Sequence, residues 1–370
     1  MSDRPIVIAS TTLTGNNADI IADAIKSVVD WVDICLVIDT GVSDDSLRIA
    51  REIAGDKYRE RSFPWRNDFA AARNFALDAA HEAGADWAVT LDTDERIHSD
   101  GEDLRAIMQS ASEGCLMMSH AARTYAKARC VRLPCPERYS GPTHEALPGY
   151  KLGQRTLARS FFSELGKTPA QLERKFQRDV EILLAHLAEH PQDARWHYYL
   201  GDSLRNLGKY PEAIQAYDAC AELRGWNEES AWACYQAADC LSRLGRFREV
   251  IDRCARGLTR HAGIAELCWL AGFAAFKLND NPQAVYWSRM AIAQGLFKGA
   301  GAKVPRIGFR NPNALYEGPY DVLRFALRNM GDSAGAAEAE RLYHEAIKAR
   351  TTPQPAKPQS DANATSNAAE

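Results

Sequence analysis

The chain has 370 residues, of which 46% are hydrophobic and 25% are charged, with a formal net charge of -4. This length is roughly two to three times that of a usual domain, so we expect at least two domains, each with its own core. The near-neutral charge argues against a general polyanion binder, and nucleic acid is therefore not an expected partner.

The cysteines indicate a reducing compartment. Nine cysteines are scattered along the chain, an odd total with no CxxC pair. Such a pattern is typical of free core thiols in the cytosol rather than of a disulfide framework. No stretch approaches about 20 consecutive apolar residues, and the N-terminus lacks a basic region followed by a long apolar one. We therefore expect a cytoplasmic protein without a transmembrane segment.

Residues 1–165 alternate short apolar runs with amphipathic segments. The predicted strands lie at 6–9, 34–38, 58–63 and 87–91. The predicted helices lie at 17–30, 44–54 and 68–83. Continuous apolar strands separated by helices indicate a parallel sheet that is covered on both faces. We therefore predict a Rossmann-like α/β domain over 1–165.

From about residue 166 the strand pattern disappears and a helical repeat begins. Small residues recur at Gly201, Ala238 and Gly272, with offsets of 37 and 34 residues. Small side chains at such a spacing let the two helices of a hairpin approach closely. The pattern resembles the tetratricopeptide repeat, which implies an all-α superhelix over 166–350. We expect a partial repeat at 170–190 and a last helical pair that contains Leu323, Leu327, Met330 and Ala336.

Two segments do not follow the repeat. Residues 299–316 are rich in Gly and Pro and predict an irregular but ordered insertion. Residues 351–370 contain three prolines and no aromatic residue. Because such a segment buries too little apolar surface to offset its ordering entropy, we expect a disordered tail.

Polar residues follow the predicted strands at the edge where parallel strands end. Thr11 comes after the first strand, Asp39 after the second, and Asp92 and Asp94 after the strand at 87–91. Ligands of open parallel sheets bind beyond this edge. The two carboxylates of Asp92 and Asp94 would hold one divalent cation, which would neutralise a departing diphosphate. The alternative is that both are solvated turn residues.

Three ordered motifs resemble the family 2 glycosyltransferases of the GT-A fold. They are DTGVSDDS at 39–46, DFAAARN at 68–74 and LDTDE at 91–95. The likeness is to a branch whose members often carry C-terminal tetratricopeptide repeats. The resemblance implies a GT-A domain that transfers a sugar from a nucleotide-diphosphate donor by inverting displacement. Val42 departs from the pattern, which usually has a small hydroxyl residue at this position.

The resemblance also implies roles for the matching residues. The matching residues expected to contact the nucleotide-sugar are Asp39, Asp44, Asp68, Arg73, Asn74 and Asp92. Thr11 is also expected to contact it, because it follows the first strand at the same edge. The expected ligands of a divalent cation, Mn²⁺ or Mg²⁺, are Asp92, Asp94 and His144. Asp44 has an alternative role as a cap of the following helix.

The segment GPTHE at 141–145 resembles the GxxHE segment of the same branch. Inversion is a single displacement at the anomeric carbon, so the acceptor hydroxyl needs a carboxylate within hydrogen-bond reach. Glu145 is the leading candidate for this base, and Glu95 is the second.

Basic residues gather in two stretches that would flank a diphosphate or an anionic acceptor. The first consists of Arg123, Lys127, Arg129, Arg132 and Arg138. The second consists of Lys298, Lys303, Arg306 and Arg310. The alternative is that each is a solvated basic loop.

We therefore expect a metal-assisted glycosyltransferase that acts on a glycan, a lipid-linked glycan or a protein. A lipid-linked acceptor would place the enzyme at the inner face of the membrane. The repeats would hold the acceptor, bind a protein partner or mediate self-association. The alternative is an adaptor whose repeats bind a partner while the α/β domain is catalytically inactive.

Overall fold

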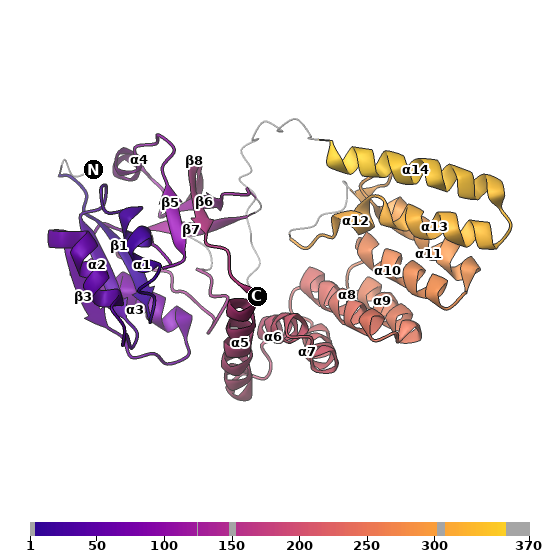
Figure 1. Ribbon diagram of the computed structural model, residues 1–370, viewed down its shortest axis with the longest axis horizontal. Helices are drawn as coiled ribbons and strands as arrows, with labels where there is room; N and C mark the ends of the chain where they lie inside the picture. The colour runs from indigo at the N-terminus through magenta and orange to yellow at the C-terminus, as the bar shows by residue number, and fades with distance from the viewer. Residues whose placement is uncertain (1–3, 124, 148–152, 302–307, 353–370) are drawn as a thin grey trace. The chain divides into compact units, whose positions relative to one another are not determined.

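The structure is a computed structural model that describes residues 4–123, 125–147, 153–301 and 308–352. The chain divides into two compact units between Ala170 and Gln171. The first is an α/β unit and the second is all-helical, as the sequence predicts (Figure 1). The predicted disordered tail lies outside the described residues from 353 onward.

The elements of the α/β unit alternate as strands and helices along its first half. The strands are β1 (Ile8–Thr14), β2 (Ile34–Asp39), β3 (Tyr58–Ser62), β4 (Trp87–Thr90), β5 (Glu95–His98), β6 (Cys115–His120), β7 (Ala126–Arg132) and β8 (Gln154–Glu164). The helices are α1 (Ile21–Lys26), α2 (Ser46–Ala54), α3 (Phe69–Glu82) and α4 (Leu104–Ser110), with a short 3-10 helix at Gly55–Lys57.

The strands of the described residues form one mixed sheet in the order β3-β2-β1-β4-β7-β6-β8-β5. The four strands predicted from the sequence, β3, β2, β1 and β4, are parallel to one another. β7 then pairs antiparallel with β4 and with β6, and β8 pairs parallel with β6 and antiparallel with β5. The expectation of a parallel sheet therefore holds for one half. The other half is mixed, and its strands β7 and β8 lack the continuous apolar runs that are typical of parallel strands buried on both faces.

Both faces of the parallel half are covered by helices. Because successive side chains of a strand point to opposite faces, β2 serves two cores. Cys35 and Val37 pack in a cluster that includes residues of α1, α2 and α4. Leu36 and Ile38 pack in a second cluster that includes α3. The sheet therefore lies between two helical layers.

Two predicted boundaries differ from the structure. β1 continues to Thr14, so Thr11 lies inside the strand and not after it. The run of β-branched residues Thr11 and Thr12 favours this extension. The first helix is also shorter than the predicted 17–30, because only Ile21–Lys26 is α-helical. The β-branched Val28 and Val29 follow it in a series of turns.

The helical unit consists of antiparallel pairs that follow one long helix. The helices are α5 (Pro169–Glu189), α6 (Ala194–Asn206), α7 (Tyr210–Leu223), α8 (Asn227–Arg243), α9 (Phe247–Arg260), α10 (Ala265–Lys277), α11 (Asn281–Gln294), α12 (Pro312–Leu315), α13 (Gly318–Asn329) and α14 (Ser333–Thr351). The predicted partial repeat at 170–190 is the single helix α5. The described parts of the predicted insertion lie between α11 and α13 and contain the short helix α12.

The recurring small residues lie where paired helices cross. A Cβ added to Gly201 on α6 would lie 2.6 Å from ring carbons of Tyr217 on α7. A Cβ added to Gly272 on α10 would lie 3.1 Å from the Ser288 hydroxyl on α11. Both glycines are therefore required by close packing within a hairpin. In the described part of the chain, no helix is long and apolar enough to cross a membrane.

Candidate functional site

The segment after β4 presents acidic residues at the carboxyl edge of the parallel strands. The Glu95 amide donates to the Asp92 carbonyl over 3.0 Å, which closes a tight turn directly after the buried strand. Within this turn, the Thr93 hydroxyl hydrogen-bonds the Asn17 amide oxygen over 2.7 Å and so ties the turn to the loop after β1. Asp92 and Asp94 therefore lie at the edge where the sequence places them.

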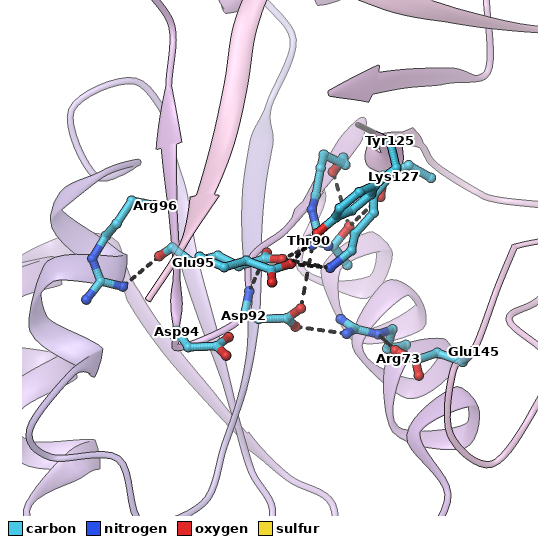
Figure 2. Close-up of polar contacts among 12 residues, drawn as sticks. Arg73, Thr90, Asp92, Asp94, Glu95, Arg96, Tyr125, Lys127 and Glu145 are labelled. Atoms are coloured by element: carbon cyan, nitrogen blue, oxygen red, sulfur yellow. Dashed lines mark hydrogen bonds and ion pairs between the residues drawn. The ribbon is translucent and has the colours of Figure 1, made fainter. Parts of the chain in front are cut away.

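Arg73 connects two of the predicted motifs. Its guanidinium is buried and extends from α3. The guanidinium donates from Nη2 to Asp92 Oδ1 over 2.8 Å and from Nε to Glu145 Oε1 over 2.5 Å (Figure 2). Arg73 and Glu145 are 72 residues apart in the sequence. The structure thus brings Asp92, Arg73 and Glu145 into one contact network at the sheet edge.

Glu145 is carried by a loop that is anchored to α3. The Asn74 side chain accepts from the Tyr139 amide over 2.8 Å and donates to the Tyr139 carbonyl over 3.0 Å. Ser140 and Ala146 pair through their backbones, which brings the two ends of the 140–146 turn together. Asn74 therefore holds the loop that carries Glu145. Exposed His144 lies in this turn with a left-handed φ of 52°.

A second group of charges lies beside Asp92, and its members Glu95 and Arg129 are buried. Glu95, at the start of β5, contacts Arg129 and is 3.1 Å from Lys127 Nζ. Lys127 in turn lies 2.8 Å from Glu164 on β8. Arg129 also approaches Asp92 to 3.6 Å, so this group joins the Arg73 network through Asp92. Figure 2 shows Lys127 and Tyr125 beside Glu95, with Arg73 and Glu145 across Asp92.

The same surroundings shift the pKa values of Asp92 and Glu95 in opposite directions. Burial tends to raise the pKa of Asp92, but the charges of Arg73, Arg129 and Lys127 together hold it well below its usual range. Burial and the Asp92 charge raise the pKa of Glu95 above its usual value, against the effect of Arg129 and Lys127. Asp92 is therefore a stable anion.

The sequence suggested Glu95 as the second choice for the base, but its position does not suit this role. Its side chain is 1% exposed, and two cations approach its carboxylate. An acceptor hydroxyl at the surface does not reach such a group. The position of Glu95 as the first residue of a strand whose side chain points into the core explains this burial. Its role in the structure is to neutralise Arg129.

Asp94 faces a cation of its own chain. Lys167 Nζ lies 2.5 Å from Asp94 Oδ2, and the Leu165 amide donates to the Asp94 carbonyl over 2.8 Å. Lys167 lies directly after β8, so the end of the α/β unit folds against the DTDE turn. Sequence reasoning did not identify Lys167, because nothing local to it distinguishes it from a surface lysine.

The predicted metal ligands do not form a three-residue site. Within the described ranges, no group of three or more His, Cys, Asp and Glu is arranged to hold a metal ion. Asp92 and Asp94 are partly exposed, and their hard carboxylate oxygens fit Mg²⁺ or Mn²⁺. Mg²⁺ in phosphate-binding sites is usually held by one or two carboxylates, with phosphate oxygens and water as its other ligands. His144 is not part of a ligand group with them.

Several residues that were predicted to contact the nucleotide have hydrogen-bond partners within the chain. Asp39, the last residue of β2, accepts from the amides of Gly41 and Val42, both over 2.8 Å. Asp44 accepts from the amides of Ser46 and Ala18. The N-cap residue of α2 is Asp45, so Asp44 does not have the alternative role of helix cap.

Asp68 is the N-cap of α3 and accepts from the Ala71 amide over 2.9 Å. Thr11 is buried within β1, between β2 and β4, and its hydroxyl has no hydrogen-bond partner among the described residues. A contact between Thr11 and a ligand beyond the strand end is therefore not supported. The extension of β1 to Thr14 is the physical reason.

The two basic stretches do not form continuous patches. In the first, Lys127 and Arg129 turn inward to Glu95, whereas Arg138 pairs with Asp78 over 2.7 Å. In the sequence of β7, Lys127 and Arg129 alternate with small apolar residues. This alternation is the one sequence signal that both cations lie on the same face of the strand.

In the second basic stretch, Lys298 pairs with Glu345 over 3.0 Å and Arg310 lies 3.5 Å from Glu228. Lys303 and Arg306 lie outside the described residues. The two described cations thus contact acidic groups of the same chain.

Comparisons with known proteins distinguish the two units. The family described as glycosyl transferase family 2 matches residues 12–168, and the tetratricopeptide repeat matches residues 194–225. A TPR repeat-containing protein of Synechococcus elongatus is 40% identical over 82 residues, which cover 22% of this chain and 19% of that protein. The SPbeta prophage-derived glycosyltransferase SunS of Bacillus subtilis is 24% identical over 232 residues, which cover 58% of this chain and 52% of that protein.

The chain thus spans about a fifth of the length of the TPR repeat-containing protein and about half of the length of SunS. Among solved structures, MamA from Desulfovibrio magneticus RS-1 is 16% identical, with a TM-score of 0.37 and coverage of 50% of this chain and 99% of its own. The family match begins in β1 and includes the DTDE turn, Arg73 and Glu145. Residues 12–168 therefore match glycosyl transferase family 2, and residues 194–225 of the helical unit match the tetratricopeptide repeat.

Proposed function

We propose that the α/β unit transfers a sugar from a nucleotide-diphosphate donor to an acceptor hydroxyl, with inversion at the anomeric carbon. The observation that carries this proposal is the contact network of Asp92, Arg73 and Glu145 at the carboxyl edge of the parallel strands. Ligands of open α/β sheets bind at this edge. The match of residues 12–168 to glycosyl transferase family 2 supports the reaction class.

Glu145 is the proposed base. An inverting displacement removes one proton from the acceptor hydroxyl, and a carboxylate within hydrogen-bond reach accepts it. Arg73 holds Glu145 Oε1 and therefore fixes the orientation of the carboxylate. Asn74 fixes the loop from the other side through Tyr139. These contacts make Glu145 an oriented group rather than a mobile surface side chain.

A divalent cation, Mn²⁺ or Mg²⁺, would be held by Asp94 and Asp92. The ion would supply positive charge to the departing diphosphate. Lys167, which neutralises Asp94 here, and Lys127, whose side chain is 38% exposed, are further cations close to the same turn. Together they would lower the cost of bringing a diphosphate to a carboxylate-rich edge.

The acceptor is proposed to be a glycan, a lipid-linked glycan or a protein, with the helical unit as the part that binds it or another protein. We propose a cytoplasmic location, at the inner face of the membrane where the acceptor is lipid-linked. All nine cysteines are free and buried, which supports a reducing compartment.

The test is a screen of donor hydrolysis across nucleotide-sugars, with Mn²⁺, with Mg²⁺ and with a chelator. We expect hydrolysis of one donor, and we expect Asp94→Asn to lower it by about 100-fold, since a metal ion supplies several kcal/mol of charge stabilisation. Asp78→Asn is the matched control. Asp78 also pairs with one cation at the surface, Arg138, but it is not part of the DTDE turn. Equal activity of the two variants would refute the role of Asp94.

Glu145→Gln separates binding from chemistry. Gln keeps an oxygen that accepts from Arg73, so donor affinity measured by calorimetry should stay within about twofold of that of the wild type. Sugar transfer should fall by about 10²- to 10⁴-fold, the usual contribution of a general base. If no nucleotide binds to the wild type at all, the α/β unit is catalytically inactive and the adaptor function is favoured instead.

A further inference from the structure

A short segment after β8 is attached to Asp94, one of the two carboxylates proposed to hold a divalent cation. Residues 165–168 belong to the α/β unit, form neither helix nor strand, and connect β8 to α5. The Lys167 ammonium lies 2.5 Å from Asp94 Oδ2, and the Leu165 amide donates to the Asp94 carbonyl over 2.8 Å. We call residues 165–168 the connecting segment. Its backbone and its cation thus both bind the same residue of the DTDE turn.

The two carboxylates of the turn are neutralised in different ways. Asp92 faces two guanidinium groups, Arg73 at 2.8 Å and Arg129 at 3.6 Å, whose side chains are 10% and 4% exposed. Asp94 instead faces a lysine, and the side chains of Lys167 and Asp94 are 33% and 29% exposed. Exposed ion pairs contribute little free energy, and a lysine ammonium sits on a flexible stem. The cation at Asp94 is therefore exchangeable, whereas those at Asp92 are fixed by burial.

Lys167 and a divalent cation need the same carboxylate. Mg²⁺ and Mn²⁺ bind to carboxylate oxygens, and Oδ2 of Asp94 is the atom that the Lys167 ammonium contacts. An ion that joined Lys167 at Asp94 would place two positive centres on one carboxyl group, where they repel each other. The lysine and the ion are therefore alternatives at Asp94.

The neighbouring charges favour exchange rather than addition. Glu95 contacts Arg129 and Lys127, and Glu164 also contacts Lys127, so the other carboxylates beside the turn have cations of their own. When Lys167 leaves, the charge of Asp94 loses the compensation that Lys167 provides. An ion that binds then compensates this charge, whereas an ion that binds beside Lys167 adds positive charge to an already neutralised group.

We propose that Lys167 and a divalent cation compete for Asp94, and that binding of the ion releases the connecting segment from the DTDE turn. Lys167 is then a positioning residue that controls when the ion binds. The inference rests on the proposed metal site at Asp94 and goes beyond it, because it couples this site to a segment outside the three sequence motifs. Such coupling is reciprocal, so a released segment raises the affinity for the ion by the same factor.

The test measures binding of Mn²⁺ to the full chain by electron paramagnetic resonance, in which the free ion gives the signal. Lys167→Met removes the competing ammonium from an exposed position. We expect this variant to bind Mn²⁺ at least about fivefold more tightly than the wild type, the lower end of the usual range for coupled binding events. Asp94→Asn in the Lys167→Met background should abolish this gain, and a gain that persists would overturn the proposal.

Two further lysines provide controls. Lys298→Met removes an equal charge from another surface pair, in which Lys298 lies 3.0 Å from Glu345. Lys127→Met removes a charge beside the same turn, but from Glu95 and Glu164 rather than from Asp94. Because solvent and salt screen partly exposed charges, both variants should bind Mn²⁺ within about twofold of the wild type. A gain in Lys127→Met as large as that in Lys167→Met would overturn the proposal, since nearby charge and not competition would then explain it.

Hydrogen exchange of the Leu165 amide tests the release of the segment. This amide is bonded to the Asp94 carbonyl, so its exchange rate reports whether the segment is attached. In the wild type, we expect exchange at saturating Mn²⁺ to be at least about fivefold faster than with a chelator, because the same coupling applies. Unchanged or slower exchange would overturn the proposal.

The outcomes separate this inference from the proposed function. Equal Mn²⁺ affinity of the wild type and Lys167→Met would overturn the competition and leave the metal site at Asp94 in place. If neither protein binds Mn²⁺, the metal site itself is refuted, and the inference with it. Lys167→Gln carries the same expectation and replaces Lys167→Met if circular dichroism shows that the Met variant is unfolded.

Discussion

Glu95 and Glu164 have the same cation, Lys127, as a neighbour but lie in different surroundings. Glu95 is 1% exposed and also neutralises buried Arg129, whereas the Glu164 side chain is 30% exposed. The removal of one partner from a buried ion pair leaves the other charge without compensation, while exposed pairs contribute little. The burial of each carboxylate, and not its number of cations, therefore sets its importance for stability.

We predict that Glu95→Gln lowers the free energy of unfolding by about 3 to 5 kcal/mol. Glu164→Gln, the control, should lower it by less than about 1 kcal/mol, since the pair is at the surface. Urea denaturation of both variants measures the difference. Losses of similar size in the two variants would contradict the assignment of Glu95 to a buried ionic group.

Asp202 couples the stability of the first hairpin to pH. The Tyr217 hydroxyl on α7 donates to Asp202 Oδ1 on α6 over 2.6 Å. Burial raises the pKa of Asp202, and the hydrogen bond from Tyr217 and the charge of Arg205 offset this only in part. A raised carboxyl pKa means that the folded state binds the proton more tightly than the unfolded chain. This contribution to stability is complete below the unfolded pKa and is lost as pH rises through the folded pKa.

We predict that Asp202→Asn removes this pH dependence, because Asn is neutral and still accepts from Tyr217. The free energy of unfolding of the wild type should therefore fall relative to that of the variant as pH rises from about 4, the usual pKa of an unfolded Asp. Denaturation followed by circular dichroism at 222 nm across this range measures it. Asp252→Asn, at an exposed position of α9, is the control. A difference that stays constant with pH would rule out this coupling.

The hairpins of the helical unit depend on size complementarity between paired helices. Gly201 faces the fully buried ring of Tyr217, and Gly272 faces the smaller Ser288. Sequence periodicity alone identified both glycines as positions of close approach, since small residues recur there at repeat spacing. The large residue that each glycine accommodates was not predictable, because it lies on the other helix of the pair.

We predict that Gly201→Ala lowers the free energy of unfolding by about 1 to 3 kcal/mol, the usual cost of overpacking a core. The Tyr217 ring cannot shift easily, because its hydroxyl is bound to Asp202. Gly272→Ala should cost less, since its closest contact is a 3.1 Å approach to the Ser288 hydroxyl. Gly166→Ala, where an added Cβ meets no described atom within 4 Å, is the control for thermal denaturation. Equal melting temperatures of all three variants would contradict the packing argument.

The strands β1, β2 and β4 have continuous apolar runs and were predicted, whereas β7 and β8 have mixed patterns and were not. β1, β2 and β4 are almost entirely buried, so both of their faces contribute apolar residues. β7 and β8 each contain exposed or partly exposed residues as well as buried ones. β7 pairs with β4 and β6, and β8 pairs with β6. These partners are distant in the sequence, so the residues of β7 and β8 alone do not identify them.

The two units have separate hydrophobic cores. Two buried clusters of the α/β unit contain only residues before 171, and two clusters of the helical unit contain only residues after it. The division lies close to the boundary at residue 165 that the sequence pattern suggested. A unit with its own core is expected to fold independently.

We predict that residues 1–170 and 171–352, expressed separately, each fold and each melt cooperatively. Circular dichroism should show a mixed α/β spectrum for the first fragment and a helical spectrum for the second. The full chain should show both transitions within a few degrees of those of the fragments. An unfolded first fragment would mean that its core requires residues of the helical unit.

The sequence by itself determined the α/β unit followed by helical hairpins, the edge that carries Asp92 and Asp94, and the small residues at the helix crossings. These features follow from local periodicity and from the common direction of parallel strands. Only the tertiary structure decided that Arg73 joins Asp92 to Glu145, that Glu95 is buried against Arg129, and that Phe309 packs against Tyr198 and Trp232. Each of these contacts joins segments far apart in the chain, so their partners are selected by the packing of whole elements rather than by any neighbouring residues.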